Sequence, residues 1–142
     1  MKIRVLTASK KGKFKAIAEE LATLAANGIY KADIIPPAYA CDNERLIIIL
    51  ITPASMPRKN EVERFIEGMN RQRTRNAAFI VDGTEEQIAP IIEKVKENDV
   101  NVLDVLYMNG GLPGPLSMFS KMTAEDKEAA TAWYNDILTK LA

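Results

Sequence analysis

The chain contains no histidine and only one cysteine, Cys41. Histidine is the commonest general base and the commonest metal ligand in proteins, so Ser-His-Asp, Cys-His and zinc-histidine chemistry are excluded. A single cysteine cannot form a disulfide within the chain. Any chemistry must therefore come from other side chains, from backbone groups or from a bound cofactor.

The chain also lacks net charge and long hydrophobic runs. Nineteen basic and nineteen acidic residues cancel, so no overall field attracts nucleic acid or an anionic membrane, and we expect neither as a partner. No apolar run approaches the roughly 18 residues of a membrane span, and we find no signal-peptide pattern. We expect a cytoplasmic protein. With 142 residues, 47% of them apolar, we expect a single domain over residues 1–142.

Apolar runs of strand length alternate with helical patterns along the chain. The runs cover residues 3–6, 32–35, 46–51, 77–81 and 100–107. The third run is rich in isoleucine and unbroken by polar residues, as expected for a strand buried on both faces. Strand-helix alternation implies right-handed parallel crossovers. We predict an α/β fold of three layers, with a doubly wound, five-stranded parallel sheet in the order 2-1-3-4-5.

The helical patterns follow the i, i+3, i+4 rule, and three of them carry capping signals at their starts. The paired residues are Asn60 with Glu63, Thr84 with Gln87, and Thr123 with Asp126. Pro90 is expected in the early part of the third helix, where it has no N–H to donate to the preceding turn. Trp133 lies in the apolar stripe of the last helix, so we expect it in the core.

The first strand leads into a lysine-rich turn and then a helix that begins near Phe14. A helix that opens directly after a strand offers unpaired N–H groups and the positive end of its dipole to a phosphate. Lysines at positions 10, 11, 13 and 15 crowd this positive end, and a bound anion would relieve their repulsion. The alternative is a solvated turn whose charges are screened by water and salt.

The sequence of this turn resembles the phosphate loop of flavodoxin-like proteins, Ser/Thr-x-Thr-Gly-x-Thr, followed by a helix of the form x-x-Ile-Ala-x-x-Leu. The corresponding segment is Ser9-Lys10-Lys11-Gly12-Lys13-Phe14, followed by Lys15-Ala16-Ile17-Ala18-Glu19-Glu20-Leu21. Ser9 and Gly12 match, whereas Lys11 and Phe14 replace two hydroxyl residues. The loop is thus a degenerate one. Phe14 is expected to pack against the sheet as the first member of the apolar stripe of the helix.

The resemblance implies FMN as the cofactor and electron transfer or redox chemistry as the function, with no catalytic side chain. The residues implied for the phosphate are Ser9, Lys10, Lys11, Gly12 and Lys13. The residues implied for the flavin ring are Thr52, Met56, Asp82, Gly83 and Tyr107. The implied partners are a flavin or small phosphorylated ligand and a protein that exchanges electrons. The alternative is a flavodoxin-like domain that has lost FMN and serves as a binding or regulatory module for another anionic ligand.

Other interpretations of the motifs are weaker. Gly12-Lys13 lacks both the earlier glycine and the following hydroxyl of a Walker A loop, and no Gly-x-Gly-x-x-Gly follows the first strand. The loop over residues 108–122 is either a lid or a surface excursion. Arginines 71, 73 and 75, placed at the end of the second helix, are interpreted either as solvated charges or as a dock for an acidic partner or nucleic acid.

Overall fold

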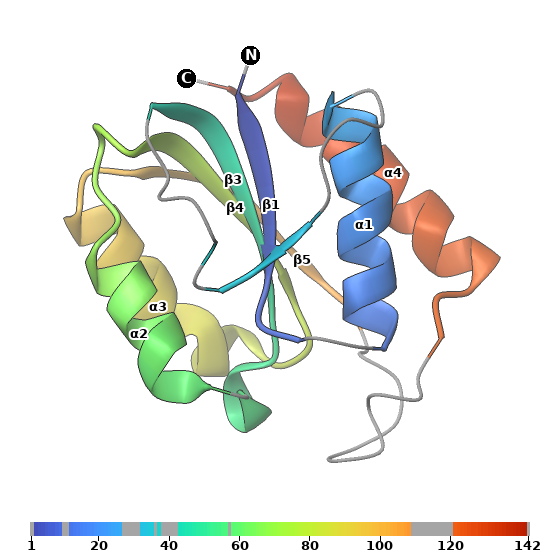
Figure 1. Cartoon of the computed structure of the whole chain (residues 1–142), viewed down its shortest axis with the longest axis horizontal. Coiled ribbons are helices and arrows are strands. Elements are labelled where there is room, and N and C mark those ends of the chain that lie inside the picture. Colours follow the sequence, from blue (N-terminus) through green and yellow to red (C-terminus); the bar gives the residue numbers. More distant parts are fainter. Residues whose placement is uncertain are drawn as a thin grey trace.

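The computed structural model describes residues 2–9, 12–26, 32–35, 37, 43–56, 58–108 and 121–141. The strands are β1 (Ile3–Thr7), β2 (Asp33–Ile34), β3 (Glu44–Ile51), β4 (Thr74–Val81) and β5 (Asn101–Tyr107). The helices are α1 (Lys13–Ala26), α2 (Lys59–Glu67), α3 (Glu85–Glu97) and α4 (Ala124–Leu138), with a short 3-10 turn, η1 (Pro53–Ser55). Figure 1 shows these elements along the chain.

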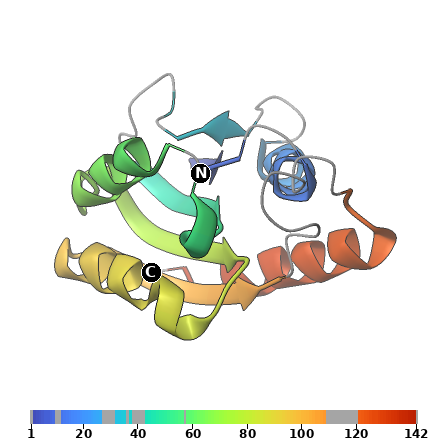
Figure 2. The same cartoon turned by 90° about the horizontal axis from the view of Figure 1, so that it is seen from below.

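All strand pairs are parallel and the five strands stand in the order β2-β1-β3-β4-β5, so the predicted α/β fold and sheet order are confirmed. Helices α1 and α4 cover one face of the sheet, and α2 and α3 cover the other (Figure 2). The two faces form separate apolar clusters, one against each helix pair. These are the three predicted layers.

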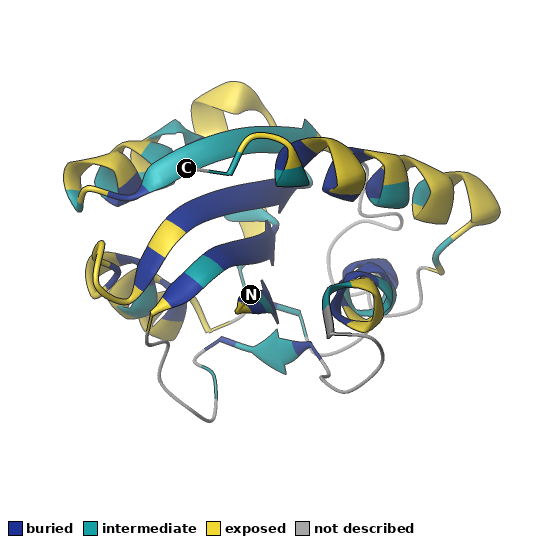
Figure 3. Ribbon diagram, turned by 90° about the horizontal axis from the view of Figure 1, so that it is seen from above, coloured by how far each residue is buried: buried dark blue, intermediate teal, exposed yellow. Residues whose placement is uncertain are grey.

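The centre of the core is β3, in which every residue from Leu46 to Ile51 has no exposed surface. Alternate side chains serve the two clusters, since Ile48 packs on the α1 and α4 side whereas Ile49 packs on the α2 and α3 side. Figure 3 shows that the inner strands of the sheet are buried, whereas β5 at the edge is partly exposed. Phe14 and Trp133 are buried in the α1 and α4 cluster, as predicted.

The capping signals near Thr84 and Thr123 are confirmed, because each residue forms a reciprocal capping box with the residue three positions later. The predicted cap at Asn60 is wrong. The residue before α2 is Arg58, in a left-handed conformation with φ of 56°, and it makes no side-chain capping bond. The geometry of the chain entering α2 thus overrides the local Asn60-Glu63 signal. Pro90 is the sixth residue of α3, inside the helix.

The second helix is also shorter than its apolar pattern indicates. Helix α2 ends at Glu67, and a turn follows in which the Asn70 side chain accepts hydrogen bonds from the N–H groups of Gln72 and Arg73, both at 3.0 Å. The arginines therefore do not lie at a helix C-terminus. Arg71 and Arg73 lie in this turn and Arg75 lies on β4, which begins three residues earlier than predicted.

The exposed edge of the sheet carries two features that oppose pairing with another strand. The register of β5 shifts between Val102 and Asp104, which leaves Leu103 as an extra residue. Asp104 accepts a hydrogen bond from the indole N–H of Trp133 at 3.1 Å and lies 3.8 Å from the Lys140 ammonium. A bulge and an inward charge both protect edge strands. Within the described residues, none of the helices is long and apolar enough to cross a membrane.

We expect Ile48→Ala to lower the free energy of unfolding by about 2 to 5 kcal/mol, because it removes buried methyl groups and leaves a cavity at the centre of the sheet. Ile48→Val should cost about 0.5 to 1.5 kcal/mol. Urea unfolding followed by circular dichroism measures both. Lys96→Ala, on the exposed side of α3, is the matched control. Equal stabilities of Ile48→Ala and Lys96→Ala would contradict the central place of β3.

Candidate ligand site at the carboxyl edge of the sheet

The carboxyl ends of four strands are aligned at one edge of the sheet, the lower end in Figure 1. Thr7 of β1 pairs with Leu50 of β3, and Val81 of β4 pairs with both Ile51 and Tyr107. In open parallel sheets, ligands bind beyond the carboxyl ends where the strand order reverses. Here the reversal lies between β1 and β3, so the loops after these strands border the candidate site.

The chain leaves β1 through a turn fixed by Thr7, whose side chain is fully buried. The Thr7 hydroxyl accepts a hydrogen bond from the Ser9 N–H at 3.1 Å and can donate to the Ser9 carbonyl at 3.3 Å. The backbone continues to pair on both sides, because the Ala8 N–H donates to Leu50 O and the Ile35 N–H donates to Thr7 O. Ser9 is thereby held, partly exposed, at the edge of the sheet.

Gly12 directly precedes α1 and has a φ of 91°, a conformation that favours glycine. Its carbonyl accepts the hydrogen bond from the Ala16 N–H, so it closes the first turn of the helix. The N–H groups of the first turn have no carbonyl partner within α1. They are the strongest anion donors that the described part of this loop offers, because they carry the positive end of the helix dipole.

The Lys13 side chain is buried and does not stand alone at this N-terminus. Its ammonium lies 3.1 Å from Oδ1 of Asp126, at the start of α4, and the two side chains are only 9% and 16% exposed. Asp126 is also the partner of the N-cap residue Thr123 in the capping box of α4, since its Oδ2 accepts the Thr123 N–H at 2.9 Å. Burial alone would raise the pKa of Asp126, but hydrogen bonds from the Thr123 N–H and the Lys13 ammonium lower it below its usual value.

Lys15 also has partners within the protein. Its ammonium donates to the Ala32 carbonyl at 3.2 Å and lies 3.5 Å from Glu19. Two of the four lysines that suggested an anion are thus compensated by carboxylates of the chain itself. The charge argument now depends on Lys10 and Lys11, which lie outside the described residues.

The loop after β3 supplies Thr52 and Met56, both partly buried. Thr52 precedes η1, and its carbonyl accepts from the Ser55 N–H at 3.1 Å. Met56 packs against the apolar cluster under α2 and α3. Of the two roles that a methionine in this loop can have, cover for a flavin or packing under the loop, the described contacts are those of packing.

The loop after β4 supplies Asp82 and Gly83. The Asp82 N–H donates to Ile51 O at 3.1 Å, which keeps the β3 and β4 loops in register. A Cβ on Gly83 would lie 2.7 Å from Oε1 of Gln87, the atom that accepts the Thr84 N–H in the capping box of α3. The absence of a side chain at Gly83 therefore allows α3 to begin close to this edge.

Tyr107 ends β5 and is 44% exposed, which is rare for a large apolar side chain in the described part of the chain. Partial burial and the nearby Glu85 carboxylate raise the pKa of Tyr107 above its usual value. The phenol stays neutral at physiological pH and offers an exposed aromatic surface at the carboxyl edge.

The structure thus brings Ser9, Gly12, Thr52, Asp82, Gly83 and Tyr107 to one edge, directs Lys13 toward α4, and packs the partly buried Met56 against the cluster under α2 and α3. Lys10, Lys11 and most of the connection 108–122 lie outside the described residues. Asp126 is the residue that sequence reasoning missed. Its capping role was predicted from Thr123, but its pairing with Lys13 joins residues too far apart in the sequence for any local pattern to indicate.

No family model matches the chain, and no curated protein matches its sequence. A search of solved structures finds a diflavin flavoprotein A3 from Nostoc sp., with a TM-score of 0.55 and 12% sequence identity. The match covers 98% of this chain and 97% of that chain. At this identity the likeness concerns the fold. Together with the sheet order β2-β1-β3-β4-β5, it shows that the chain has a flavodoxin-like fold.

We expect Gly12→Ala to destabilise the protein by about 1 to 2 kcal/mol, because a residue with a Cβ is strained at positive φ. Gly68→Ala is the matched control, since Gly68 has a φ of −83° and an added Cβ would make only ordinary contacts, at 3.5 Å and more. Thermal unfolding of both variants tests the difference. A Gly12→Ala protein as stable as the Gly68→Ala protein would contradict the assigned backbone conformation.

We expect Asp126→Asn to cost about 1 to 3 kcal/mol at pH 7, because it removes one partner of a largely buried ion pair. Since folding lowers the pKa of this carboxyl, its contribution is present above about pH 4 and is lost as the pH falls through the folded pKa. The stability difference between wild type and variant should therefore narrow below pH 4.

Urea titrations between pH 7 and pH 3 test this pH dependence. Asp136→Asn is the control on the same helix, because its ion pair with Lys140 is exposed, screened by solvent, and should contribute little to stability. Equal, pH-independent losses of stability in the two variants would show that the Lys13-Asp126 pair stabilises the fold no more than the exposed Lys140-Asp136 pair does.

Proposed function

We propose that this protein is an FMN-associated redox or electron-transfer protein. Bound FMN supplies the electron chemistry, and the chain binds it, orients it and sets its surroundings. The observation that carries the proposal is the β1-α1 turn, in which Gly12 adopts a φ of 91° and aims the first-turn N–H groups of α1 at the carboxyl edge. A flavin phosphate is an anion suited to these donors.

The other end of the proposed site is formed by the loops after β3, β4 and β5. Thr52, Asp82 and Gly83 bring backbone groups to the polar edge of the flavin ring, and Tyr107 offers an exposed aromatic surface against which the ring can stack. The phosphate end fits better than the ring end, because the described contacts of Met56 are with the apolar cluster under α2 and α3. The proposed partners are the flavin and a protein that exchanges electrons with it.

A second candidate is supported by the Lys13-Asp126 pair. A carboxylate beside the phosphate loop lowers the local positive charge, and the replaced hydroxyl residues remove donors. Both features suit a domain that has lost FMN and binds another anionic ligand as a regulatory or binding module. The two candidates make opposite predictions for flavin binding.

The test is to record the visible absorption of the purified protein and to titrate it with FMN while following flavin fluorescence. Under the proposal the protein is yellow as isolated or quenches added FMN. Ser9→Ala should weaken FMN binding about 2- to 12-fold by removing one hydrogen bond to the phosphate, and should leave riboflavin, which has no phosphate, unaffected. Ser55→Ala, an exposed serine in η1, is the matched control.

One result would decide against this function: a colourless protein that leaves the fluorescence of FMN unchanged would favour the second candidate. If Ser9→Ala weakened FMN and riboflavin equally, the function would stand but the serine would not contact the phosphate.

A further inference from the structure

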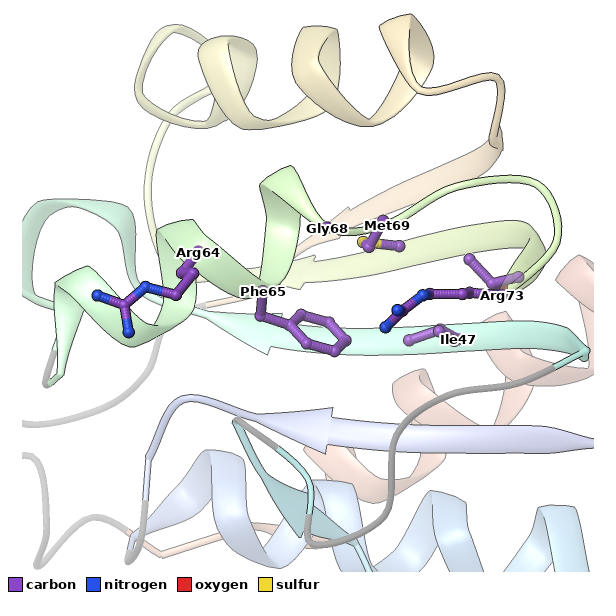
Figure 4. A pocket seen from close by; sticks show the side chains of 7 residues that line it. Ile47, Arg64, Phe65, Gly68, Met69 and Arg73 are labelled. Atoms are coloured by element: carbon purple, nitrogen blue, oxygen red, sulfur yellow. The ribbon is translucent and has the colours of Figure 1, made fainter.

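A pocket of about 110 Å³ lies at the opposite edge of the sheet, between the end of α2 and the start of β4 (Figure 4). Its lining comprises Ile47, Arg64, Phe65, Gly68, Met69, Arg73 and Thr74. Cofactor pockets generally measure about 300 to 1,000 Å³, so this one is too small for a flavin or a nucleotide. Its volume suits a single anchoring side chain of a partner molecule.

The base of the pocket is apolar and rigid. Ile47 has no exposed surface, Met69 is 4% exposed, and both belong to the apolar cluster under α2 and α3. The Phe65 ring is only partly buried and lies across the pocket mouth, pointing toward the Arg73 side chain (Figure 4). An apolar side chain entering here would contact the Phe65 ring and the Met69 thioether, above the buried Ile47.

The backbone holds Arg73 in place. Its N–H donates to both the carbonyl and the side-chain oxygen of Asn70, and its carbonyl accepts from the Glu44 N–H at 2.9 Å. The end of α2 is tied as well, because the Asn98 amide donates to the carbonyls of Ile66 and Glu67, both at 3.3 Å. The arginine is therefore presented by a preorganised turn, which lowers the entropic cost of binding.

Two arginines and no carboxylate are among the described residues that line the pocket, although the whole chain is neutral. Five of the seven arginines of the chain lie between residues 58 and 75, but Arg58 lies at the start of α2, away from the pocket at the end of this helix. Among the described residues, Arg71 pairs with Asp99, whereas no carboxylate pairs with Arg64 or Arg73. The Arg73 guanidinium thus borders an apolar pocket without a carboxylate partner among the described residues, and a partner with a carboxylate would complement it (Figure 4).

We infer that this pocket docks a segment of a partner protein in which a large apolar side chain stands beside an aspartate or glutamate. The apolar side chain enters between Phe65 and Met69, and the carboxylate pairs with Arg73. Arg64 also lines the pocket, but its guanidinium points away from the Phe65 ring (Figure 4). A nucleic acid is disfavoured, because Phe65 is partly buried and is the only aromatic side chain among the described residues that line the pocket. This inference does not depend on flavin binding.

The test uses a phage-displayed library of random heptapeptides, selected against the full-length protein at low salt. We expect the selected sequences to share an acidic residue next to Leu, Ile, Phe or Met. The best selected peptide is then synthesised with a fluorescent label and titrated by fluorescence polarisation against the wild-type protein and its variants.

Arg73→Glu should weaken binding at least tenfold, and Arg64→Glu should weaken it less, because its guanidinium points away from the Phe65 ring (Figure 4). Arg75→Glu is the matched control, since Arg75 is an exposed arginine two residues away that does not line the pocket, and it should change the affinity less than threefold. Raising the salt concentration should weaken wild-type binding more than Arg73→Glu binding. Circular dichroism checks the fold of each variant. If Arg73→Glu unfolds, Arg73→Gln is used in its place.

Three results would overturn the inference. The first is a selection that yields no shared acidic and apolar pattern. The second is a selected peptide that binds wild type, Arg73→Glu and Arg73→Gln equally. The third is tighter binding of a single-stranded oligonucleotide than of any selected peptide, with that binding lost in Arg73→Glu.

Discussion

The burial of β3 on both faces is the constraint on which the rest of the structure depends. Six consecutive apolar residues, Leu46 to Ile51, have no exposed surface, so each face of the sheet must be covered by helices. Parallel pairing with β1 and β4 then requires crossovers, and each crossover returns the chain so that the strands end at the same edge. The carboxyl edge is therefore a consequence of the core, and the loops that border the candidate site are placed by it.

Charge is distributed unevenly over this frame. At the carboxyl edge, the two described lysines at the start of α1 are compensated by carboxylates of the protein, Lys13 by Asp126 and Lys15 by Glu19. The donors that remain for an anion there are mainly backbone N–H groups, whose direction is set by Gly12 and the axis of α1. At the amino edge the situation is reversed, because Arg64 and Arg73 border an apolar pocket without carboxylate partners in the described structure. Lysines that are paired with carboxylates of the protein favour a selective site for a small ligand. Guanidinium groups without such a partner favour recognition of a charged surface.

The features that could be predicted from the sequence are those with a local physical signature. The unbroken run in β3, the strand-helix alternation and the capping boxes at Thr84 and Thr123 each depend on residues close together in the chain, and each is confirmed. Asn60 has the same local signature as Thr84, but the left-handed Arg58 fixes the start of α2 instead. The Lys13-Asp126 pair and the pocket at Arg73 could not be predicted, because both depend on how distant elements approach one another. The strand order predicted from the sequence is enough to bring Ser9, Gly12 and Tyr107 to one edge, but it does not reveal that Lys13 pairs with Asp126.

The two proposed sites lie at opposite ends of the same strands, and this separation has a functional consequence. Strand β3 has eight residues, and at about 3.3 Å per residue its two ends are roughly 20 to 25 Å apart. A partner anchored near Arg73 would not occupy the loops after β1 and β3, so docking and ligand binding need not compete. Coupling between them would require movement of a strand whose central residues are fully buried, and such a core deforms little. We therefore expect the two surfaces to bind independently, with the sheet acting as a rigid spacer that holds a partner at a fixed distance from the carboxyl edge.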